Sequence, residues 1–192
     1  MPERRPAGRR GSAARPAPSA TTPPATTPPA TTPPVTVRRA TPDDLEVVLA
    51  MRLALLRAHA GNVVYGRLRA DAPERARRLF AEQLASPHEA TWLAVDAAGG
   101  ALGILRCMEG RGSPLLDPPR YGYVASVWVA PEARRTGILH LLMAAAEAWT
   151  RERGLDELRL HAAADNATAT AAWQAMGFTV AEQLFVRRLP AD

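Results

Sequence analysis

The sequence predicts an α/β domain, or more loosely an α+β domain, preceded by a segment that cannot form a core. Three observations predict it. Ten of the 18 prolines lie in the first 34 residues. From residue 35 onward, segments of alternating apolar residues follow segments with apolar residues at helical spacing. A strand over residues 121–129, a helix from residue 138 and a strand over residues 157–162 follow one another, which implies a parallel pair joined by a right-handed crossover.

The N-terminal segment, residues 1–34, carries no large apolar side chain after Met1. Such a segment buries too little apolar surface to fold, so we expect a disordered tail rich in Pro, Thr and Arg. Residues 21–35 repeat a TTPPA-like unit three times, which favours extended polyproline II. The tail is either a solvated extension or a docking arm for a proline-recognising partner. The remaining residues, 35–192, are long enough for one domain with a single core.

The charge of the chain resides mainly in this tail. The formal net charge is +5 at pH 7, and the five arginines and Glu3 of the tail account for +4 of it. The domain itself is close to neutral, so we expect no nucleic-acid partner. No apolar run approaches the roughly 20 residues needed to cross a bilayer. Cys107 is the only cysteine, which excludes an internal disulfide, and the four histidines lack metal-ligand spacing. We therefore expect a cytoplasmic protein that binds neither a metal nor a membrane.

The first half of the domain predicts a strand, two helices and a hairpin. The first helix begins at the hydroxyl cap Thr41, with Pro42 and two acidic residues in its first turn. The loop over residues 110–119 contains three prolines and is long enough to cover a site. The other elements are expected at residues 35–39 for the first strand, 73–85 for the second helix, and 91–95 and 101–108 for the hairpin.

The second half contains the strand–helix–strand unit and a last helix. Gly154 ends the middle helix. Asp165 or Asn166 caps the last helix, Gly177 ends it, and residues 178–189 predict one or two final strands. The middle helix has one apolar face, which consists of Ile138, Leu141, Leu142, Ala145 and Trp149.

The turn before the middle helix predicts an anion site. A helix N-terminus leaves backbone N–H groups without partners and carries part of a positive charge. Arg134 and Arg135 add side-chain charge, and Gly137 permits close approach to the backbone. These residues indicate a phosphate-bearing ligand. The chain has no lysine and no glycine-rich nucleotide motif, so Walker-type and Rossmann-type binding are poorly supported.

Two runs carry a resemblance to a known family. The first is V-W-V-A-P-E-A-R-R-T-G-I-L over residues 127–139, and the second is N-A-T-A-T-A-A-W-Q-A-M-G-F over residues 166–178. Together they resemble the pyrophosphate motif and the helical motif of the GCN5-related N-acetyltransferase (GNAT) superfamily. The resemblance implies a mixed, mostly antiparallel sheet with a splayed parallel strand pair, flanked by about four helices. It covers nearly all of residues 35–190.

The resemblance also implies acetyl-CoA as co-substrate and direct transfer of its acetyl group to a primary amine. The backbone of Val127, Trp128 and Val129 would bind the pantetheine arm. Asn166 would lie near the pantetheine end and Trp173 near the thiol. The pyrophosphate would be held by Arg134, Arg135, Thr136, Gly137, Ile138, Leu139 and His140.

The chain departs from the family pattern at several positions. Leu139 stands where the motif has Gly or Ala. Its side chain either narrows the approach of the cofactor to the backbone or points away from the cofactor. Trp173 replaces a Tyr proposed as the acid in many members, and an indole is not a usable acid. No carboxylate lies between residues 120 and 131. The candidates for a catalytic water relay are Tyr123, Ser126 and His161. Two acids in or beside the long loop, which would attract a cationic amine, are Glu109 and Asp117.

These inferences define a functional hypothesis and its alternative. The hypothesis is an acetyl-CoA-dependent N-acetyltransferase acting on a small-molecule or peptide amine. The alternative is a non-catalytic acyl-CoA-binding or regulatory module with the same fold. The resemblance also leads us to expect a homodimer. Acceptor identity is not readable from any motif of the chain.

Overall fold

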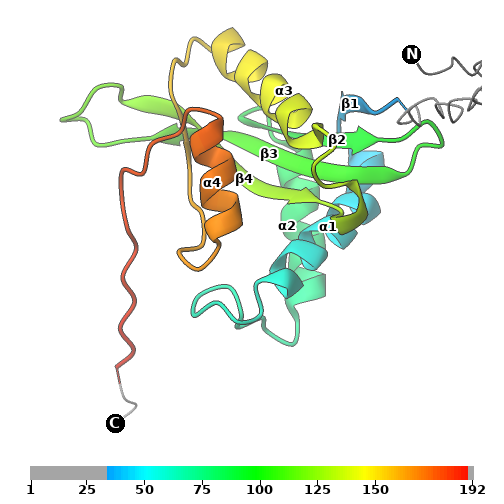
Figure 1. Cartoon of the computed structure of the whole chain (residues 1–192), viewed down its shortest axis with the longest axis horizontal. Helices are drawn as coiled ribbons and strands as arrows, with labels where there is room; N and C mark the ends of the chain where they lie inside the picture. Colours follow the sequence, from blue (N-terminus) through cyan, green and yellow to red (C-terminus); the bar gives the residue numbers. More distant parts are fainter. Residues whose placement is uncertain (1–33, 190–192) are drawn as a thin grey trace, which may run out of the picture. The chain divides into compact units, whose positions relative to one another are not determined.

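The computed structural model describes residues 34–189, and its framework is one five-stranded sheet (Figure 1). The first four strands pair antiparallel with their neighbours, and the fifth strand pairs parallel with the fourth. This arrangement confirms the expected mixed sheet. The expected tail lies outside the described residues except for Pro34, so its character stays a prediction. In sheet order, the strands are β1 (Thr36–Arg39), β2 (Glu89–Val95), β3 (Ala101–Arg111), β4 (Arg120–Val129) and β5 (Leu158–Leu160).

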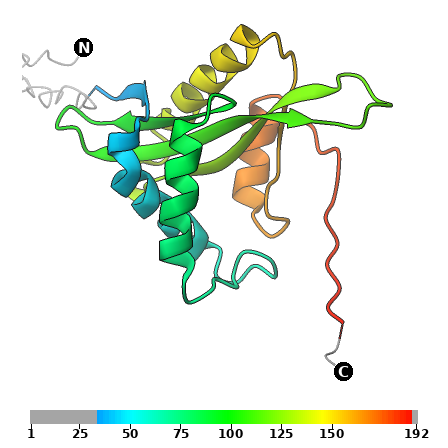
Figure 2. The same ribbon diagram turned by 180° about the vertical axis from the view of Figure 1, so that it is seen from behind.

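Four α-helices occur among the described residues, as expected, and they cover both faces of the sheet (Figures 1 and 2). Helices α1 and α2 lie side by side on one face, and α3 lies on the other, because each has one apolar face to bury. Side chains of α4 pack against the core on the α3 face. The helices are α1 (Leu45–Ala58), α2 (Ala72–Ala85), α3 (Ile138–Glu152) and α4 (Ala167–Ala175).

The two faces have separate cores. Large side chains that are fully buried under α1 and α2 include Leu93 and Ile104. On the α3 face, Leu105, Cys107 and Leu142 are fully buried. Alternate residues of β3 thus serve opposite faces, as the two-residue period of a strand requires.

An ion pair fixes the start of the first helix. Asp44 accepts hydrogen bonds from both terminal nitrogens of Arg38 at 2.7 and 2.8 Å and from the backbone N–H of Thr41 at 2.8 Å. The hydrogen bonds from Arg38 are the largest cause that lowers the pKa of Asp44 to about 2. The buried carboxylate therefore ties β1 to the beginning of α1.

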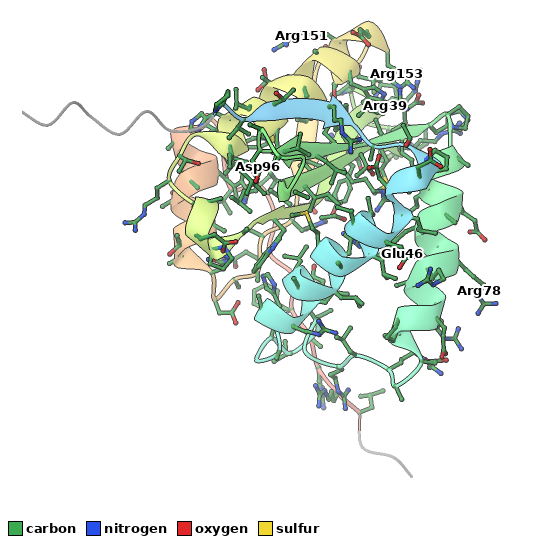
Figure 3. The ribbon with its side chains drawn as sticks, turned by 90° about the vertical axis from the view of Figure 1, so that its right-hand side faces the viewer. Arg39, Glu46, Arg78, Asp96, Arg151 and Arg153 are labelled. Atoms are coloured by element: carbon green, nitrogen blue, oxygen red, sulfur yellow. The ribbon has the colours of Figure 1, made fainter. Side chains whose placement is uncertain are left out.

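Charged residues occupy the outer helix surfaces (Figure 3). Arg78 and Arg151 point away from the fold, whereas Glu46 of α1 forms an ion pair with Arg77 of α2. Within residues 34–189, no helix has the length and apolarity that a membrane span requires.

The hairpin between β3 and β4 extends further than expected. Both strands continue beyond their predicted ends, so the connecting loop shortens to residues 112–119. The hairpin tip projects past the rest of the sheet (Figure 1). Its base is held by Arg159 of β5, whose guanidinium carbon lies 4.0 Å from the ring centroid of Tyr121.

The expectation of a final strand is wrong in this structure. Residues 178–189 form no assigned strand and leave α4 as an extended ribbon (Figure 1). A strand needs a neighbour to complete its hydrogen-bond ladder, and no ladder to β5 forms along this segment. Several of its large apolar side chains are consequently exposed: Val180, Leu184, Phe185, Val186 and Leu189.

Candidate functional site

Strands β4 and β5 separate where β4 bulges. Their parallel pairing covers only residues 122–124 of β4. On the other edge, Ser126 and Val127 lie opposite the single residue Leu105 of β3, because the register shifts there. Ser126 has φ 60°, a left-handed conformation that is uncommon for a residue with a side chain. Residues 125–129 therefore face a notch on the β5 side, where no described strand pairs with them.

The expected pantetheine residues lie along this notch. Val127, Trp128 and Val129 all belong to the unpaired edge of β4. The side chains of Val127 and Val129 pack against the α3 face, and Trp128 packs against the α1 and α2 face. Their backbone N–H and C=O groups therefore face the notch. An extended ligand can pair with them there as an additional strand would.

The turn into α3 forms a cradle of backbone N–H groups. Arg135 has φ 63° and Gly137 has φ 87°, so the chain curls just before the helix begins. Among the described residues, the five consecutive N–H groups of residues 135–139 donate to no acceptor, and the N–H of His140 is the first to bond, to Gly137 O at 3.0 Å. These N–H groups and the helix dipole together suit an anion. The expected phosphate site therefore has a physical basis in the structure.

The side chains around this cradle point in different directions. Ile138 is buried in the core, and Leu139 is half-buried and packs against the same core. The leucine thus points aside, which leaves only its N–H at the cradle. Arg135, Thr136 and His140 are exposed.

Arg134 bonds to the end of β4. Its Nε donates to Val129 O at 3.1 Å, and its guanidinium carbon lies 4.8 Å from the ring centroid of Trp128. The side chain therefore contacts the end of β4, and its expected contact with the pyrophosphate stays a prediction.

Asn166 and Trp173 both belong to α4 or its cap. The Asn166 side-chain oxygen accepts a hydrogen bond from Ala169 N at 3.0 Å, which confirms that Asn166 caps the helix. Trp173 packs against the α3 core and makes an edge contact with Phe178, with ring centroids 5.8 Å apart. A cavity of about 280 Å³ lies between α3 and the end of α4. It is lined by His140, Met143, Ala144, Glu147, Ala175 and Met176.

Two of the three catalytic candidates meet. The Tyr123 hydroxyl lies 2.6 Å from Nδ1 of His161, across the parallel pair of β4 and β5. Burial, followed by the nearby Tyr65 and Tyr121, raises the pKa of Tyr123 above its ordinary value. The phenol is therefore neutral at physiological pH, and it passes protons only as a hydrogen-bond relay with the imidazole.

Ser126, the third candidate, lies apart from this pair. Its hydroxyl points under α1 and α2, where it is buried and has no hydrogen-bond partner among the described residues. The expected acid Glu109 is bound by Arg120 at 2.8 Å and lies 3.5 Å from Arg153, so it is already paired. Cys107 is fully buried, and burial raises the pKa of its thiol to about 11, which excludes a thiolate nucleophile.

Arg52 is a site residue that the sequence reasoning missed. It lines the same pocket as Ser126. A signal was present, because Arg52 follows Val48 by four residues and Leu49 by three, on the apolar face of α1. A charged residue at such a position indicates a buried functional group. Within residues 34–189, no cluster of three or more potential ligand residues is arranged to hold a metal ion.

The comparisons with known proteins agree on one class. The sequence model of the acetyltransferase (GNAT) family matches residues 60–178. An aminoglycoside N(6')-acetyltransferase type 1 of Stenotrophomonas maltophilia is 28% identical over 158 residues, which span 81% of this chain and 94% of that protein. A solved GCN5-related N-acetyltransferase from Ralstonia eutropha superposes with a TM-score of 0.66 at 25% identity, over 81% of this chain and 99% of that one.

A second solved structure supports the fold alone. An acetyltransferase from Clostridium acetobutylicum, solved with acetyl-CoA, has a TM-score of 0.67 at 17% identity, over 80% of this chain and 96% of that one. The splayed sheet with its N–H cradle thus has the fold of solved acetyltransferases. The chain belongs to the acetyltransferase (GNAT) family and is an N-acetyltransferase.

Proposed function

We propose that the protein transfers the acetyl group of acetyl-CoA directly to a primary amine. The observation that carries this proposal is that two features follow each other along the chain. They are the unpaired strand edge of residues 125–129 and the free N–H groups of residues 135–139. Acetyl-CoA has matching parts, an amide-containing pantetheine arm and a pyrophosphate. A structural neighbour that was solved with acetyl-CoA supports this assignment.

The two features suggest how the co-substrate is held. The pantetheine amides pair with the backbone of Val127 and Val129, as one more strand would. The pyrophosphate accepts hydrogen bonds from the N–H groups of the cradle, and the α3 dipole adds to the attraction. Asn166 and Trp173 then border the pantetheine and thiol end, as the family resemblance implies.

The chemical step is an acyl transfer without a covalent enzyme intermediate. The amine nitrogen attacks the thioester carbonyl carbon, and the C–S bond breaks as the tetrahedral intermediate collapses. Backbone N–H groups at the β4 bulge stabilise the negative oxygen of that intermediate. The nitrogen loses a proton through the Tyr123–His161 pair, either directly or through water. The thiolate leaves without a protein acid, because the indole of Trp173 cannot supply a proton.

The proposed acceptors are small-molecule amines. The curated relative is an aminoglycoside N(6')-acetyltransferase, and a neighbour at 22% identity was solved with a bisubstrate analogue of that kind of reaction. A peptide amine is the second acceptor class. The homodimer and the cytoplasmic location stay predictions.

The decisive experiment is a calorimetric titration of acetyl-CoA into the full-length protein, with desulfo-CoA and ATP for comparison. Saturable micromolar binding of the two CoA species is expected, and ATP should bind more weakly. Gly137→Ala forces a side chain into a left-handed conformation, so we expect about tenfold weaker acetyl-CoA binding.

A matched control separates this effect from general strain. Gly99 has φ 84°, close to the 87° of Gly137, and an added Cβ would meet nothing within 4 Å at either position. Gly99 lies in the turn between β2 and β3, so Gly99→Ala should leave the affinity unchanged. Equal losses in both variants, or a folded protein that ignores acetyl-CoA, would overturn the proposal.

The alternative expected from the sequence, a non-catalytic acyl-CoA-binding module, would be a family member that has lost its catalytic groups. Two sequence observations favour it: the absence of a carboxylate between residues 120 and 131, and the Trp at position 173. Turnover separates the two functions. CoA release that depends on an added amine excludes the module, and tight binding without release across a broad amine panel supports it.

A further inference from the structure

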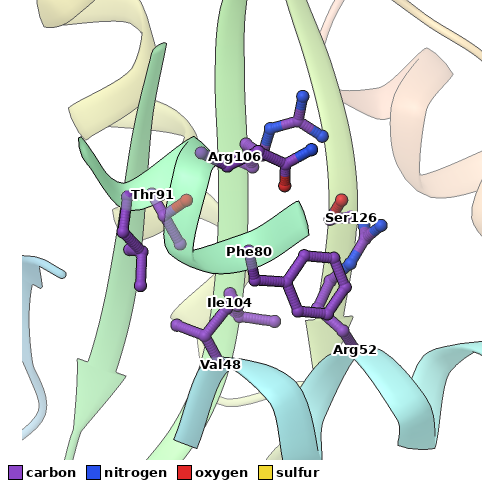
Figure 4. Close-up of a pocket in the computed structure, with 9 residues that line it drawn as sticks. Val48, Arg52, Phe80, Thr91, Ile104, Arg106 and Ser126 are labelled. Atoms are coloured by element: carbon purple, nitrogen blue, oxygen red, sulfur yellow. The ribbon is translucent and has the colours of Figure 1, made fainter. Parts of the chain in front are cut away.

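A guanidinium without an acidic partner lies beneath α1 and α2 (Figure 4). Arg52 extends from α1 along the ring of Phe80 toward Ser126 of β4. Its Nε is buried and has no hydrogen-bond partner, and within residues 34–189 Arg52 makes no ion pair. Its guanidinium carbon lies 5.0 Å from the Phe80 ring centroid, which offsets part of the desolvation of the charge.

A second guanidinium occupies the carboxylate nearest to Arg52. Arg106 of β3 lines the same pocket and is paired with Glu89 of β2. The local carboxylate is thus already engaged. Burial, followed by the charge of Arg106, lowers the pKa of Arg52 to about 10, so Arg52 is still charged at neutral pH. A guanidinium with a buried Nε is normally paired, and no carboxylate within residues 34–189 pairs with this one.

Ser126 supplies a second unsatisfied group in the same place. The residue is 9% exposed, and its buried hydroxyl has no hydrogen-bond partner among the described residues. The bulge with φ 60° turns this hydroxyl into the pocket. Ser126 directly precedes Val127, the first residue proposed to hold the pantetheine arm. The pocket therefore adjoins the proposed transfer site.

The shape of the pocket determines where an anion can bind. The pocket has a volume of about 10 Å³, which is room for a single water molecule. Within residues 34–189 the terminal nitrogens of Arg52 donate no hydrogen bond, and only Nε is both buried and unpaired, so the terminal nitrogens are open to solvent. An incoming anion therefore meets these terminal nitrogens at the mouth of the pocket.

We propose that the acceptor carries a carboxylate besides its amine, and that this carboxylate binds the terminal nitrogens of Arg52. The inference rests on the proposed acetyl transfer and narrows its acceptor class. A planar guanidinium pairs with a carboxylate through two parallel hydrogen bonds, which makes Arg52 a specificity-determining residue. An acceptor with several positive charges meets like charge at Arg52, so it should bind less tightly than an amino carboxylate.

The test compares amines that differ only in a carboxylate. A series of ω-amino carboxylates is matched with alkylamines of the same chain lengths, and tyrosine with tyramine. Affinity is measured by calorimetry on the full-length protein saturated with desulfo-CoA, and kcat and KM by CoA release where turnover occurs. The best carboxylate should bind roughly ten- to a hundredfold more tightly than its matched amine, in the range of hydrogen bonds to charged groups.

Variants of one helix identify the residue responsible. Arg52→Gln should abolish the preference by raising KM for the carboxylate, and Arg52→Lys should retain part of it. The matched control is Arg57→Gln, because Arg57 is also on α1 but exposed. Arg52→Met removes a buried charge, so it should fold with a higher melting temperature and lack the preference.

The outcomes are distinguishable. Equal affinity for both members of every pair overturns the inference, and so does a preference that survives in folded Arg52→Gln or Arg52→Met. Either result leaves the proposed acetyl transfer standing. A protein that binds no CoA species overturns the proposed function together with the inference.

Discussion

The hydroxyl of Tyr123 in β4 lies 2.6 Å from Nδ1 of His161, the residue that directly follows β5. This contact exists because β4 and β5 pair over residues 122–124 before they separate. The pair is thus fixed by the sheet at the base of the notch. Its position makes it the proton relay of the proposed mechanism.

Removal of either relay member should slow acetyl transfer. For Tyr123→Phe and His161→Gln, we expect kcat to fall by roughly a hundredfold, which is typical of a lost acid–base group, with acetyl-CoA affinity unchanged. Tyr121→Phe is the matched control, since Tyr121 contacts Arg159 and not His161. Steady-state CoA release with a reactive amine measures the effect. Full activity in both relay variants would contradict the assignment.

The Arg38–Asp44 pair should stabilise the fold in a pH-dependent way. Because the folded pKa of Asp44 is about 2, below the unfolded value of about 3.9, the pair contributes stability above pH 4, and the contribution is lost as the pH falls toward 2. Asp44→Asn should lower the free energy of unfolding by about 2 kcal/mol at pH 7, and the difference should shrink below pH 4.

Urea unfolding at several pH values measures this effect. The neighbouring Asp43 is exposed, so Asp43→Asn serves as a control, with an expected change of about 0.5 kcal/mol or less. Identical losses in the two variants would show that the ion pair does not supply the stability.

Leu139 should matter for packing and not for the co-substrate. Its side chain packs on the α3 core, so Leu139→Ala should destabilise the protein by about 1–3 kcal/mol while acetyl-CoA affinity changes less than twofold. Leu141→Ala on the same helix should have a smaller effect on stability, because Leu141 is largely exposed. A large gain in affinity for Leu139→Ala would instead mean that the leucine obstructs the cradle.

Deletion of residues 1–33 should leave acetyl transfer and the melting temperature unchanged. The proposed site lies wholly in later residues, from Arg52 to Trp173. A fall in kcat/KM after the deletion would show that the tail takes part in the reaction.

The homodimer is tested by light scattering coupled to size-exclusion chromatography. We expect a mass of twice the 20.6 kDa of one chain. A monomer at micromolar concentration would refute that expectation.

Much of the fold was predictable because local signals agree with the final packing. Asn166 has a side chain suited to capping and does cap α4, and Gly137 stands where the backbone needs a positive φ. The apolar spacing of α1 matches the face that it buries, and in α3 it does so at Ile138, Leu142 and Trp149, although Leu141 of the expected face is exposed. Local propensity and tertiary structure agree at these positions, so sequence alone suffices.

Features that depend on non-local pairing were less predictable. The bulge at Ser126 comes from the register between β3 and β4, and no residue pattern in either strand specifies it. The contact between Tyr123 and His161 required knowledge of which residues of β4 and β5 pair. The final strand was predicted from its apolar content, but strand formation also needs a hydrogen-bonded neighbour. The bond from Arg134 to the backbone of Val129 likewise depends on how the turn after β4 folds back.

The extended segment after α4 bears on how the protein behaves in solution. Phe185 is 86% exposed, and Leu184 and Leu189 are also well exposed, so apolar surface is concentrated along one uncovered stretch of backbone. The net charge of +5 keeps molecules apart at long range, but salt screens that repulsion within about 10 Å at 0.1 M. Solubility should therefore fall as ionic strength rises, and residues 180–189 should be among the first that a protease cleaves.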